Sequence, residues 1–472
     1  MEDENIVQAI PNEKASEWME ENIPLFECPQ HNFEEMYYYR WWSLRKHIKE
    51  TPVGYGMTEF LVQRSYSDKY NLIACAIGHH IYESRWLRDP KYLDQIIHTW
   101  YRGNDGGPMK KMDKFSSWNA DAVLARYMVD GDKDYLLDMK KDLETEYQRW
   151  ERTNRLKNGL YWQGDVQDGM EESISGGRRK KYARPTINSY MYGNAKALSC
   201  IGILSGDEGM AMKYGMRADT LKNLVENELW NTRHQFFETM RTDSSANVRE
   251  AIGYIPWYFN LPDTTQKYEI AWKEIMDEKG FSAPYGLTTA ERRHPEFRTR
   301  GVGKCEWDGA IWPFASAQTL TAMANFMNNY PQTVLSDSVY FRQMELYVES
   351  QYHRGRPYIG EYLDEVTGYW LKGDQERSRY YNHSTFNDLI ITGLIGLRPR
   401  LDNTIEVNPL IPADKWDWFC LDNVLYHGHN LTILWDKNGD RYHCGKGLRI
   451  FVDGKEVGQA NTLTKIVCEK CT

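Results

Sequence analysis

The chain has 472 residues, 26% of them charged, and a net charge of −9. No apolar run approaches the ~18 residues of a membrane span, and the acidic balance is unlike the basic stripe of most nucleic-acid-binding proteins. These features predict a globular protein that binds neither a membrane nor nucleic acid. Aromatic residues make up 14% of the chain. Because Trp and Tyr combine an apolar ring with a polar edge, this excess favours a protein that binds carbohydrate.

Helices are predicted from about residue 12 to residue 400. The clearest has Leu136, Met139, Leu143, Tyr147 and Trp150 at the spacing of one helical face. Further helices are predicted over residues 32–48, 70–87, 90–102, 117–129, 185–204, 207–228, 263–277, 308–328, 335–352 and 383–396. The short polar breaks between them are typical of antiparallel helices. This density favours an all-α toroid or solenoid, and the lack of a fixed repeat length argues against TPR, HEAT or ankyrin arrays.

Three long connections differ from the rest in composition. Residues 154–185, 279–307 and 353–382 are rich in glycine, aromatic and charged residues. Long loops in a compact fold are more often functional than connective. We therefore expect these three connections to build the functional site.

The periodicity changes after residue 400. Residues 404–410, 430–436 and 448–452 are β-branched or alternating, and Asn438-Gly439 and Asp453-Gly454 are typical of hairpin turns. The sequence thus predicts a helical domain over residues 1–400 and a small β-strand module over residues 401–472 that packs on it.

The sequence shows no sign of a metal or another cofactor. Cys468-x-x-Cys471 has no second pair, and His427-Gly428-His429 has no carboxylate or cysteine at ligand spacing. The acidic start, Met1 to Asn5, lacks the features of a signal peptide. As written, the chain is expected in the cytoplasm, or in the periplasm or secreted if a signal peptide was removed.

Two segments combine carboxylates with glycines and aromatic rings, residues 159–173 and 360–370. A carboxyl group beside apolar rings can have the raised pKa that a general acid needs near neutral pH. Only a closed fold could bring the two segments face to face, where two opposed carboxylates would form a glycosidase pair. Taken alone, each acid could equally be a helix cap or part of a surface ion pair.

The order of these elements resembles the six-hairpin (α/α)6 glycosidases of clan G: family 37 trehalases, family 63 α-glucosidases and the mannosylglycerate-hydrolase-like group. Residues 167–173 are similar to the family's Ser-Gly-Trp/Met-Asp-x-Ser segment, which implies that Glu171 is the general acid. The family has Asp at that position, and Asp168 is the competing candidate. Residues 361–368 resemble the family's Glu-x-x-Asp-x-x-Thr-Gly segment, which implies that Glu361 is the base.

The resemblance also implies a set of substrate contacts. Residues 306–312 are similar to the family's Tyr-Trp-Arg-Gly-Pro-Ile-Trp, with Asp308 in place of Arg. The implied contacts are Trp307, Asp308 and Trp312, together with Arg184, Asn188 and His383 near helices that border the cleft. Further candidate cleft walls are Tyr37, Arg40, Trp41, Tyr55, Trp118, Trp162, Tyr254 and Trp257. We expect about half of these walls to be ordinary core, because large rings at helical spacing usually pack inside.

The resulting hypothesis is an inverting, exo-acting glycosidase that cleaves an oligosaccharide, as a monomer or a weak homo-oligomer. The resemblance implies inversion, for which the two carboxyl groups lie roughly 6.5–9.5 Å apart. An α-L-rhamnosidase-like enzyme is an alternative with the same barrel and a β module. A polysaccharide lyase would prefer a basic cleft. A glycan-binding protein on an inactive scaffold is favoured by the departures at Glu171 and Asp308.

Overall fold

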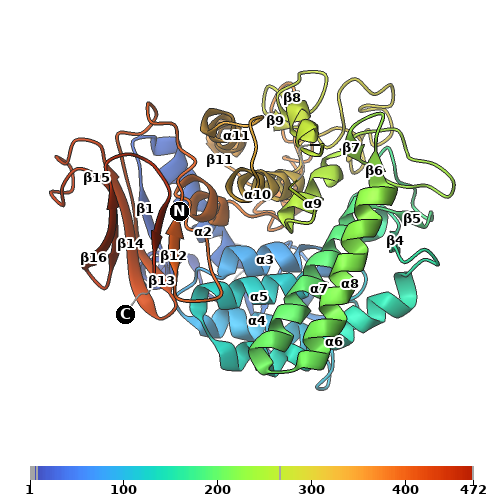
Figure 1. The fold of residues 1–472 in the computed structure, drawn as a ribbon, viewed down its shortest axis with the longest axis horizontal. Helices are drawn as coiled ribbons and strands as arrows, with labels where there is room; N and C mark the ends of the chain where they lie inside the picture. Colours follow the sequence, from blue (N-terminus) through green and yellow to red (C-terminus); the bar gives the residue numbers. More distant parts are fainter. Residues whose placement is uncertain (1–5, 7–8, 265–266, 470–472) are drawn as a thin grey trace.

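A computed structural model describes residue 6, residues 9–264 and residues 267–469. It has a large helical part and, at one side, an antiparallel sheet built mainly from the C-terminal residues (Figure 1). The prediction of a helix-rich chain with a separate β part is therefore confirmed. The domain boundary at residue 400 stays a prediction, and one strand of the sheet, β1 (Leu25–Glu27), comes from the N-terminal region.

The α-helices of the described residues are α1 (Ala15–Asn22), α2 (His31–His47), α3 (Ile77–Ser84), α4 (Pro90–Arg102), α5 (Asn119–Asp130), α6 (Lys133–Asn154), α7 (Pro185–Ser205), α8 (Glu208–Leu224), α9 (Ile255–Tyr258), α10 (Pro313–Asn329), α11 (Asp337–Ser350) and α12 (Asn387–Leu389). The apolar face predicted for residues 136–150 is the buried face of α6. Most other predicted helices lie within a few residues of their expected ends.

Contacts between helices form a closed cycle. It runs from α3 to α5, α7, α9, α10, α12 and back to α3, while α4, α6, α8 and α11 pack on its members. Helix α7 is buried around most of its circumference, whereas α8 buries one stripe, so α7 is inner and α8 is outer. The two helices approach closely at Gly202, where a Cβ atom would lie 2.5 Å from the Ala211 nitrogen.

The chain alternates between inner and outer helices from α3 to α9 and again from α10 to α12, and the 3-10 helix Glu269–Ile275 lies between α9 and α10, so the inner helices are expected to run in the same direction. Their N-terminal ends meet at one end of the cycle. The three long connections that the sequence singled out lead into α7, α10 and α12 and therefore meet at that same end. This arrangement brings segments that are far apart in the sequence to one place.

Three predicted helices are shorter or more irregular than expected. Residues 70–76 form 3-10 turns interrupted at Tyr70 and Asn71, both with left-handed backbone, and α3 begins only at Ile77. The predicted helix over 383–396 is α12 followed by a π-helix, Ile390–Leu394. The predicted helix over 263–277 lies partly outside the described residues, and its described part is a 3-10 helix, Glu269–Ile275.

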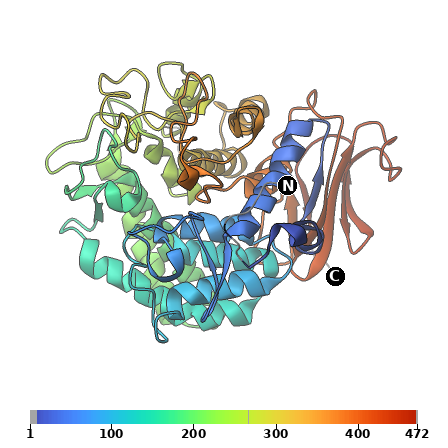
Figure 2. The ribbon, with the colours of Figure 1, turned by 180° about the vertical axis from the view of Figure 1, so that it is seen from behind.

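The main sheet has the order β1-β13-β14-β15-β16, and all its neighbours are antiparallel. Its other strands are β13 (Trp418–Tyr426), β14 (His429–Asp436), β15 (Gly447–Val452) and β16 (Lys455–Ala460); β12 (Ile405–Val407) pairs separately with β17 (Ile466–Cys468). Figure 2 shows the N-terminal segment, in blue, beside the red sheet.

One of the two predicted hairpin turns is confirmed and the other is wrong. Asp453-Gly454 joins β15 to β16 with positive φ at both residues, as a tight turn requires. Asn438-Gly439 instead lies in a longer loop, residues 437–446, because the Asp436 carboxylate accepts hydrogen bonds from the backbone of Gly439 and Arg441 and holds the loop open.

No helix among the described residues is both long and apolar enough to cross a membrane.

Candidate functional site

Three glutamates meet at the N-terminal ends of the inner helices. Glu171 lies in the connection before α7, Glu361 in the connection before α12, and Glu59 between β3 (Gly54–Met57) and α3. Burial first, and then the nearby charges of Glu361 and Asp165, raise the pKa of Glu171 to about 7. Burial, together with the charges of Glu361 and Glu171, raises the pKa of Glu59 to about 8. The two predicted carboxyls are thus within electrostatic reach of each other.

Glu361 has a different environment from the other two. Its Oε1 lies 3.3 Å from the Lys372 ammonium, and its Oε2 lies 3.7 Å from the Arg377 guanidinium. The side chain is 5% exposed, and Oε2 has no hydrogen-bond partner among the described residues. Two cations balance the negative charge of this carboxylate while one oxygen remains free to accept a proton.

Asp168, the competing acid candidate, is enclosed in a buried ion pair. Its Oδ2 lies 2.6 Å from the Arg184 Nε, and both side chains are fully inaccessible. The hydroxyls of Ser116 and Thr186 also donate to this carboxylate. Because both carboxylate oxygens are occupied, Asp168 fastens its loop to the start of α7 and has no free oxygen for a substrate.

Arg184 and Asn188 have the same kind of role. The Asn188 side chain accepts from the Tyr161 backbone nitrogen at 2.8 Å and donates to the Tyr161 carbonyl at 2.9 Å. Both residues are fully buried on the first turns of α7 or just before it. Through Asp168 and Tyr161 they hold residues 159–173 in place.

The tryptophan rings predicted over residues 306–312 form a stack with Tyr362. The centroids of Trp307 and Trp312 are 4.4 Å apart, and those of Trp312 and Tyr362 are 4.5 Å apart, with nearly parallel planes. The Lys372 ammonium lies 4.9 Å from the centre of the Tyr362 ring. Since both tryptophans are 3% exposed, this stack presents ring edges to the site and supports the segment that carries Glu361.

The Asp308 carboxylate is bound by the backbone of a neighbouring loop. Its Oδ2 accepts hydrogen bonds from the backbone nitrogens of Arg300 at 2.6 Å and Gly301 at 3.0 Å, and the residue is fully buried. The departure from the family's Arg is therefore explained locally, because this carboxylate shapes the loop over residues 298–308.

His383 and Arg40 lie beneath the glutamates. The His383 ring packs against Tyr381 with centroids 4.0 Å apart, and Arg40 donates to the Ser384 carbonyl at 2.7 Å. Both are buried, and burial and the charge of Arg40 keep the pKa of His383 well below its usual range. A neutral imidazole at this position can accept or donate one hydrogen bond.

The remaining candidates do not join this group. Trp162 is partly exposed at the rim, under the Lys181 ammonium at 4.2 Å. Tyr55 packs on Tyr92 of α4, with centroids 5.1 Å apart. The rings that turn out to be buried core are Tyr37, Trp41, Trp118, Tyr254 and Trp257. An inner helix is packed against other helices on both sides. A ring on such a helix that the sequence assigns to a cleft wall is therefore buried.

Several site residues were not predicted from the sequence. Lys372, Arg377 and Tyr381 lie in the third long connection, which was singled out as a whole but not residue by residue. Glu59 lies outside all three connections. Its signal is the short stretch Gly56-Met57-Thr58-Glu59-Phe60, an acid between a glycine and a ring, which is the composition that marked the other two acidic segments.

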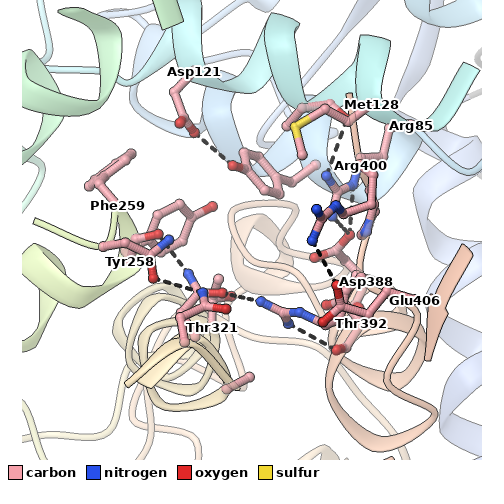
Figure 3. A pocket seen from close by; sticks show the side chains of 18 of the residues that line it. Arg85, Asp121, Met128, Tyr258, Phe259, Thr321, Asp388, Thr392, Arg400 and Glu406 are labelled. Atoms are coloured by element: carbon pink, nitrogen blue, oxygen red, sulfur yellow. Dashed lines mark hydrogen bonds and ion pairs between the residues drawn. The ribbon is translucent and has the colours of Figure 1, made fainter. Parts of the chain in front are cut away.

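A separate cavity of about 560 Å³ is lined by residues of the inner helices α3, α5, α9, α10 and α12 and by residues 398–402 (Figure 3). Its charges are paired: Arg85 lies 2.8 Å from Asp388, Arg400 lies 2.8 Å from Glu406, and Asp121 accepts from Tyr82. Cations at helix C-termini balance the negative end of the helix dipole. This electrostatic role accounts for the arginines of the cavity.

No group of three His, Cys, Asp or Glu side chains within the described part of the chain is placed to hold a metal ion. His427 lies within hydrogen-bond distance of the carbonyls of Met128 and Arg400, and His429 forms an ion pair with Asp453 at 2.7 Å. Cys471 of the Cys-x-x-Cys pair lies outside the described residues.

Two family models match this chain. Residues 69–384 match the mannosylglycerate hydrolase MGH1-like glycoside hydrolase domain, and residues 397–458 match the C-terminal domain of glycosyl hydrolase family 65. The first match spans the helical part that carries Glu171 and Glu361, whereas Glu59 lies ten residues before its start.

Solved structures are similar at very different levels of identity. A protein named sialidase is 95% identical over all of this chain with a TM-score of 0.99, and this chain spans 44% of that protein's length. The GH63 mannosylglycerate hydrolase from Thermus thermophilus, solved with glucose, is 13% identical with a TM-score of 0.54 over 75% of this chain and 99% of its own. The GH78 rhamnosidase of Bacillus sp. GL1 is 9% identical with a TM-score of 0.62 over 91% of this chain and 41% of its own.

The last two likenesses show the fold alone, whereas the first family model covers more than half of the chain. The resemblance predicted from the acidic segments is confirmed by that match. The chain belongs to the MGH1-like family of glycoside hydrolase domains.

Proposed function

We propose that this chain is an inverting, exo-acting glycoside hydrolase in which Glu171 is the general acid and Glu361 the general base. The observation that carries the proposal is the contrast between these two neighbouring carboxyls. Burial raises the pKa of Glu171 to about 7, whereas Glu361 lies between Lys372 and Arg377. Facing carboxyls in such different environments are typical of an acid and base pair.

The proposed scaffold is an (α/α)6 toroid. The closed cycle of α3, α5, α7, α9, α10 and α12 supports this scaffold, as do the packing of outer helices on the cycle and the likeness in fold to the GH63 and GH78 structures. In a toroid of this kind, the loops that precede the inner helices surround one opening. The three glutamates lie in such loops.

In the proposed reaction, Glu171 donates its proton to the glycosidic oxygen as the bond from that oxygen to the anomeric carbon breaks. A water molecule attacks the anomeric carbon from the opposite face and gives a proton to the free Oε2 of Glu361. The products are a sugar with inverted anomeric configuration and a free alcohol. Lys372 and Arg377 lie beside Glu361, at 3.3 and 3.7 Å, and balance the negative charge of the base.

A closed inner wall favours exo action. The stack of Trp307, Trp312 and Tyr362 and the buried His383 lie beneath and beside the carboxyls. A sugar chain could enter with its terminal residue but could not pass through this wall. We therefore propose that the enzyme removes terminal sugars from an oligosaccharide.

The charge of the site favours a neutral sugar. The two cations nearest to these carboxyls, Lys372 and Arg377, already lie within 4 Å of Glu361. A sialic acid or a uronate brings its own carboxylate, which would need a cation that is not already paired. The same argument counts against a polysaccharide lyase. Sialoside hydrolysis is the second candidate, because the 95% identical protein is named sialidase.

The test is a screen of p-nitrophenyl glycosides of neutral hexoses and deoxyhexoses, in both anomeric forms, beside a p-nitrophenyl sialoside. We expect release of nitrophenol from a neutral glycoside, and ¹H NMR should show the inverted anomer first. Turnover of the sialoside alone would overturn the neutral-sugar proposal, and the retained anomer would overturn inversion. Hydrolysis of a rhamnoside alone would assign the rhamnosidase alternative.

The base assignment is tested with Glu361→Gln and, as a matched control, Asp121→Asn. Glu361 is buried, whereas Asp121 is half-buried and lies in the separate cavity. General-base catalysis contributes about 10²- to 10⁴-fold, so E361Q should lose at least this factor in kcat, while D121N keeps its activity. An active E361Q would show that the base is another residue.

A further inference from the structure

Glu59 belongs to the segment that borders the proposed site, although no sequence motif marks it. The Glu59 carbonyl accepts a hydrogen bond from the Asn382 backbone nitrogen at 3.0 Å. The Tyr381 backbone nitrogen in turn donates to the Ile359 carbonyl at 3.1 Å. Glu59 is thus tied through the segment before α12 to the segment that carries Glu361.

The Glu59 side chain is buried but incompletely paired. The residue is 4% exposed, and its Oε2 has no hydrogen-bond partner among the described residues. None of the ion pairs among those residues involves Glu59, whereas Glu361 has Lys372 and Asp168 has Arg184. A buried polar atom without a partner costs free energy, so its retention calls for an explanation such as a water or a ligand.

Acidic and aromatic groups surround this carboxyl from every neighbouring element. The titratable and charged groups around it are Glu171, Glu361, Tyr381, Tyr66, Cys75 and Arg64. Arg64 is the cation among them, and it lies over the rings of Phe60 and Tyr66. Two neighbouring carboxylates and a buried position disfavour a third negative charge.

We propose that Glu59 is a third functional carboxyl, which stays protonated at neutral pH and donates a hydrogen bond to a hydroxyl of the sugar held between Glu171 and Glu361. The inference rests on the proposed function. A protonated carboxyl is a donor and an acceptor at once, as a sugar hydroxyl is. It binds the sugar without adding a second negative charge beside the Glu361 carboxylate.

The pKa of Glu59, raised to about 8 by burial and its neighbours, fits this role and gives it a pH signature. The active form is the protonated one, so kcat/KM must fall as the pH rises through about 8. Glu171, with its pKa near 7, produces a fall of its own at lower pH. Above pH 8 the logarithm of kcat/KM should therefore decrease with a slope of about −2 in the wild type.

The kinetic experiment compares Glu59→Gln with Glu59→Ala on the neutral glycoside that the wild type hydrolyses. The amide of E59Q still donates a hydrogen bond but cannot ionise, so kcat/KM at pH 6 should fall about threefold or less and the alkaline slope should become about −1. E59A should lose about tenfold or more. Equal losses in both variants, or an unchanged slope of about −2 in E59Q, would overturn the proposal. Loss of all activity in E59Q would instead identify Glu59 as the general acid.

A second experiment does not depend on turnover. The carboxyl ¹³C resonance of Glu59, assigned by its absence in E59Q, is followed with pH in protein labelled at the glutamate side chains. A midpoint near 8 supports the proposal, and a midpoint near 4.5 overturns it. A wild type that hydrolyses no glycoside would contradict the proposed function, whereas this midpoint tests Glu59 separately. Circular dichroism of both variants verifies that they fold.

Discussion

The separate cavity and the candidate site differ in how their buried charges are paired. In the cavity, Arg85 and Asp388 form a closed pair, and Arg400 pairs with Glu406. In the candidate site, Glu59 and Glu361 each keep a buried oxygen without a hydrogen-bond partner among the described residues. A buried, incompletely paired carboxyl costs several times more than a paired one. The candidate site therefore differs from the structural cavity in the incomplete pairing of its carboxyls, more than in the presence of acidic residues.

The same contrast exists within one loop. Asp168 and Glu171 are three residues apart, yet Asp168 is enclosed by Arg184, Ser116 and Thr186, whereas burial raises the pKa of Glu171 to about 7. The first acid holds the loop and the second remains available for proton transfer. Replacing each in turn should therefore change different properties of the protein.

The largest expected effect is on activity in Glu171→Gln. Loss of the general acid should lower kcat about 10²- to 10⁴-fold, and the loss should shrink with leaving groups of low pKa, which need less protonation. The measurement is kcat for a series of aryl glycosides. In the wild type, kcat/KM should also fall as the pH rises through about 7, where Glu171 loses its proton. An equal loss for all leaving groups would contradict the acid role.

The second effect is on stability in Arg184→Met. Removing this cation leaves Asp168 charged and buried, which should lower the free energy of unfolding by about 3–5 kcal/mol. Urea denaturation measures the change. The matched variant is Arg400→Gln, where the guanidinium is half exposed and Glu406 keeps Lys465 at 2.6 Å, so the expected loss is below about 1 kcal/mol. Similar losses in the two variants would break the distinction between a fully enclosed pair and a half-exposed one.

The smallest effect is on the pH dependence of stability. The pKa of Glu171 is raised in the folded state, so the folded chain binds more protons than the unfolded chain between about pH 4.5 and 7. Stability should therefore decrease as the pH rises through this window, and E171Q should flatten the decrease by on the order of 1–3 kcal/mol at pH 8. Urea unfolding of both proteins at pH 5 and pH 8 gives the comparison. An equal decrease in E171Q would assign it to other groups.

The sequence predicts the helical part well where a single face repeats over several turns, as in α6. It predicts poorly where the element is short. Helix α9 spans only Ile255–Tyr258, and β1 spans Leu25–Glu27 with its partner strand almost 400 residues away. Neither element contains enough residues to establish a period, and their conformations are determined by contacts distant in the sequence.

For the candidate site, composition and the family resemblance lead to loops whose carboxyls lie within electrostatic reach of one another, but not to every role within them. Asp168 and Glu171 have the same kind of neighbours in the sequence, and only the position of Arg184 separates them. Trp118 and Trp257 have the amphipathic rings of cleft walls, but inner helices cover them on both sides. Glu59 could not be predicted as a site residue, because it is distant from Glu361 in the sequence. The two come near each other only when the segment before α12 packs beside Glu59.

Strand β1 has a consequence for how the whole molecule unfolds. It lies along β13, and beside it Gln30 accepts a hydrogen bond from the Trp416 indole at 2.6 Å while Phe33 of α2 packs on the same indole. The N-terminal segment is therefore shared between the sheet and the helices. Unfolding of the sheet would expose α2 to solvent. Unfolding of α2 would expose the edge of β13, a surface prone to self-association. The sheet and the cycle of helices should therefore unfold in one cooperative transition.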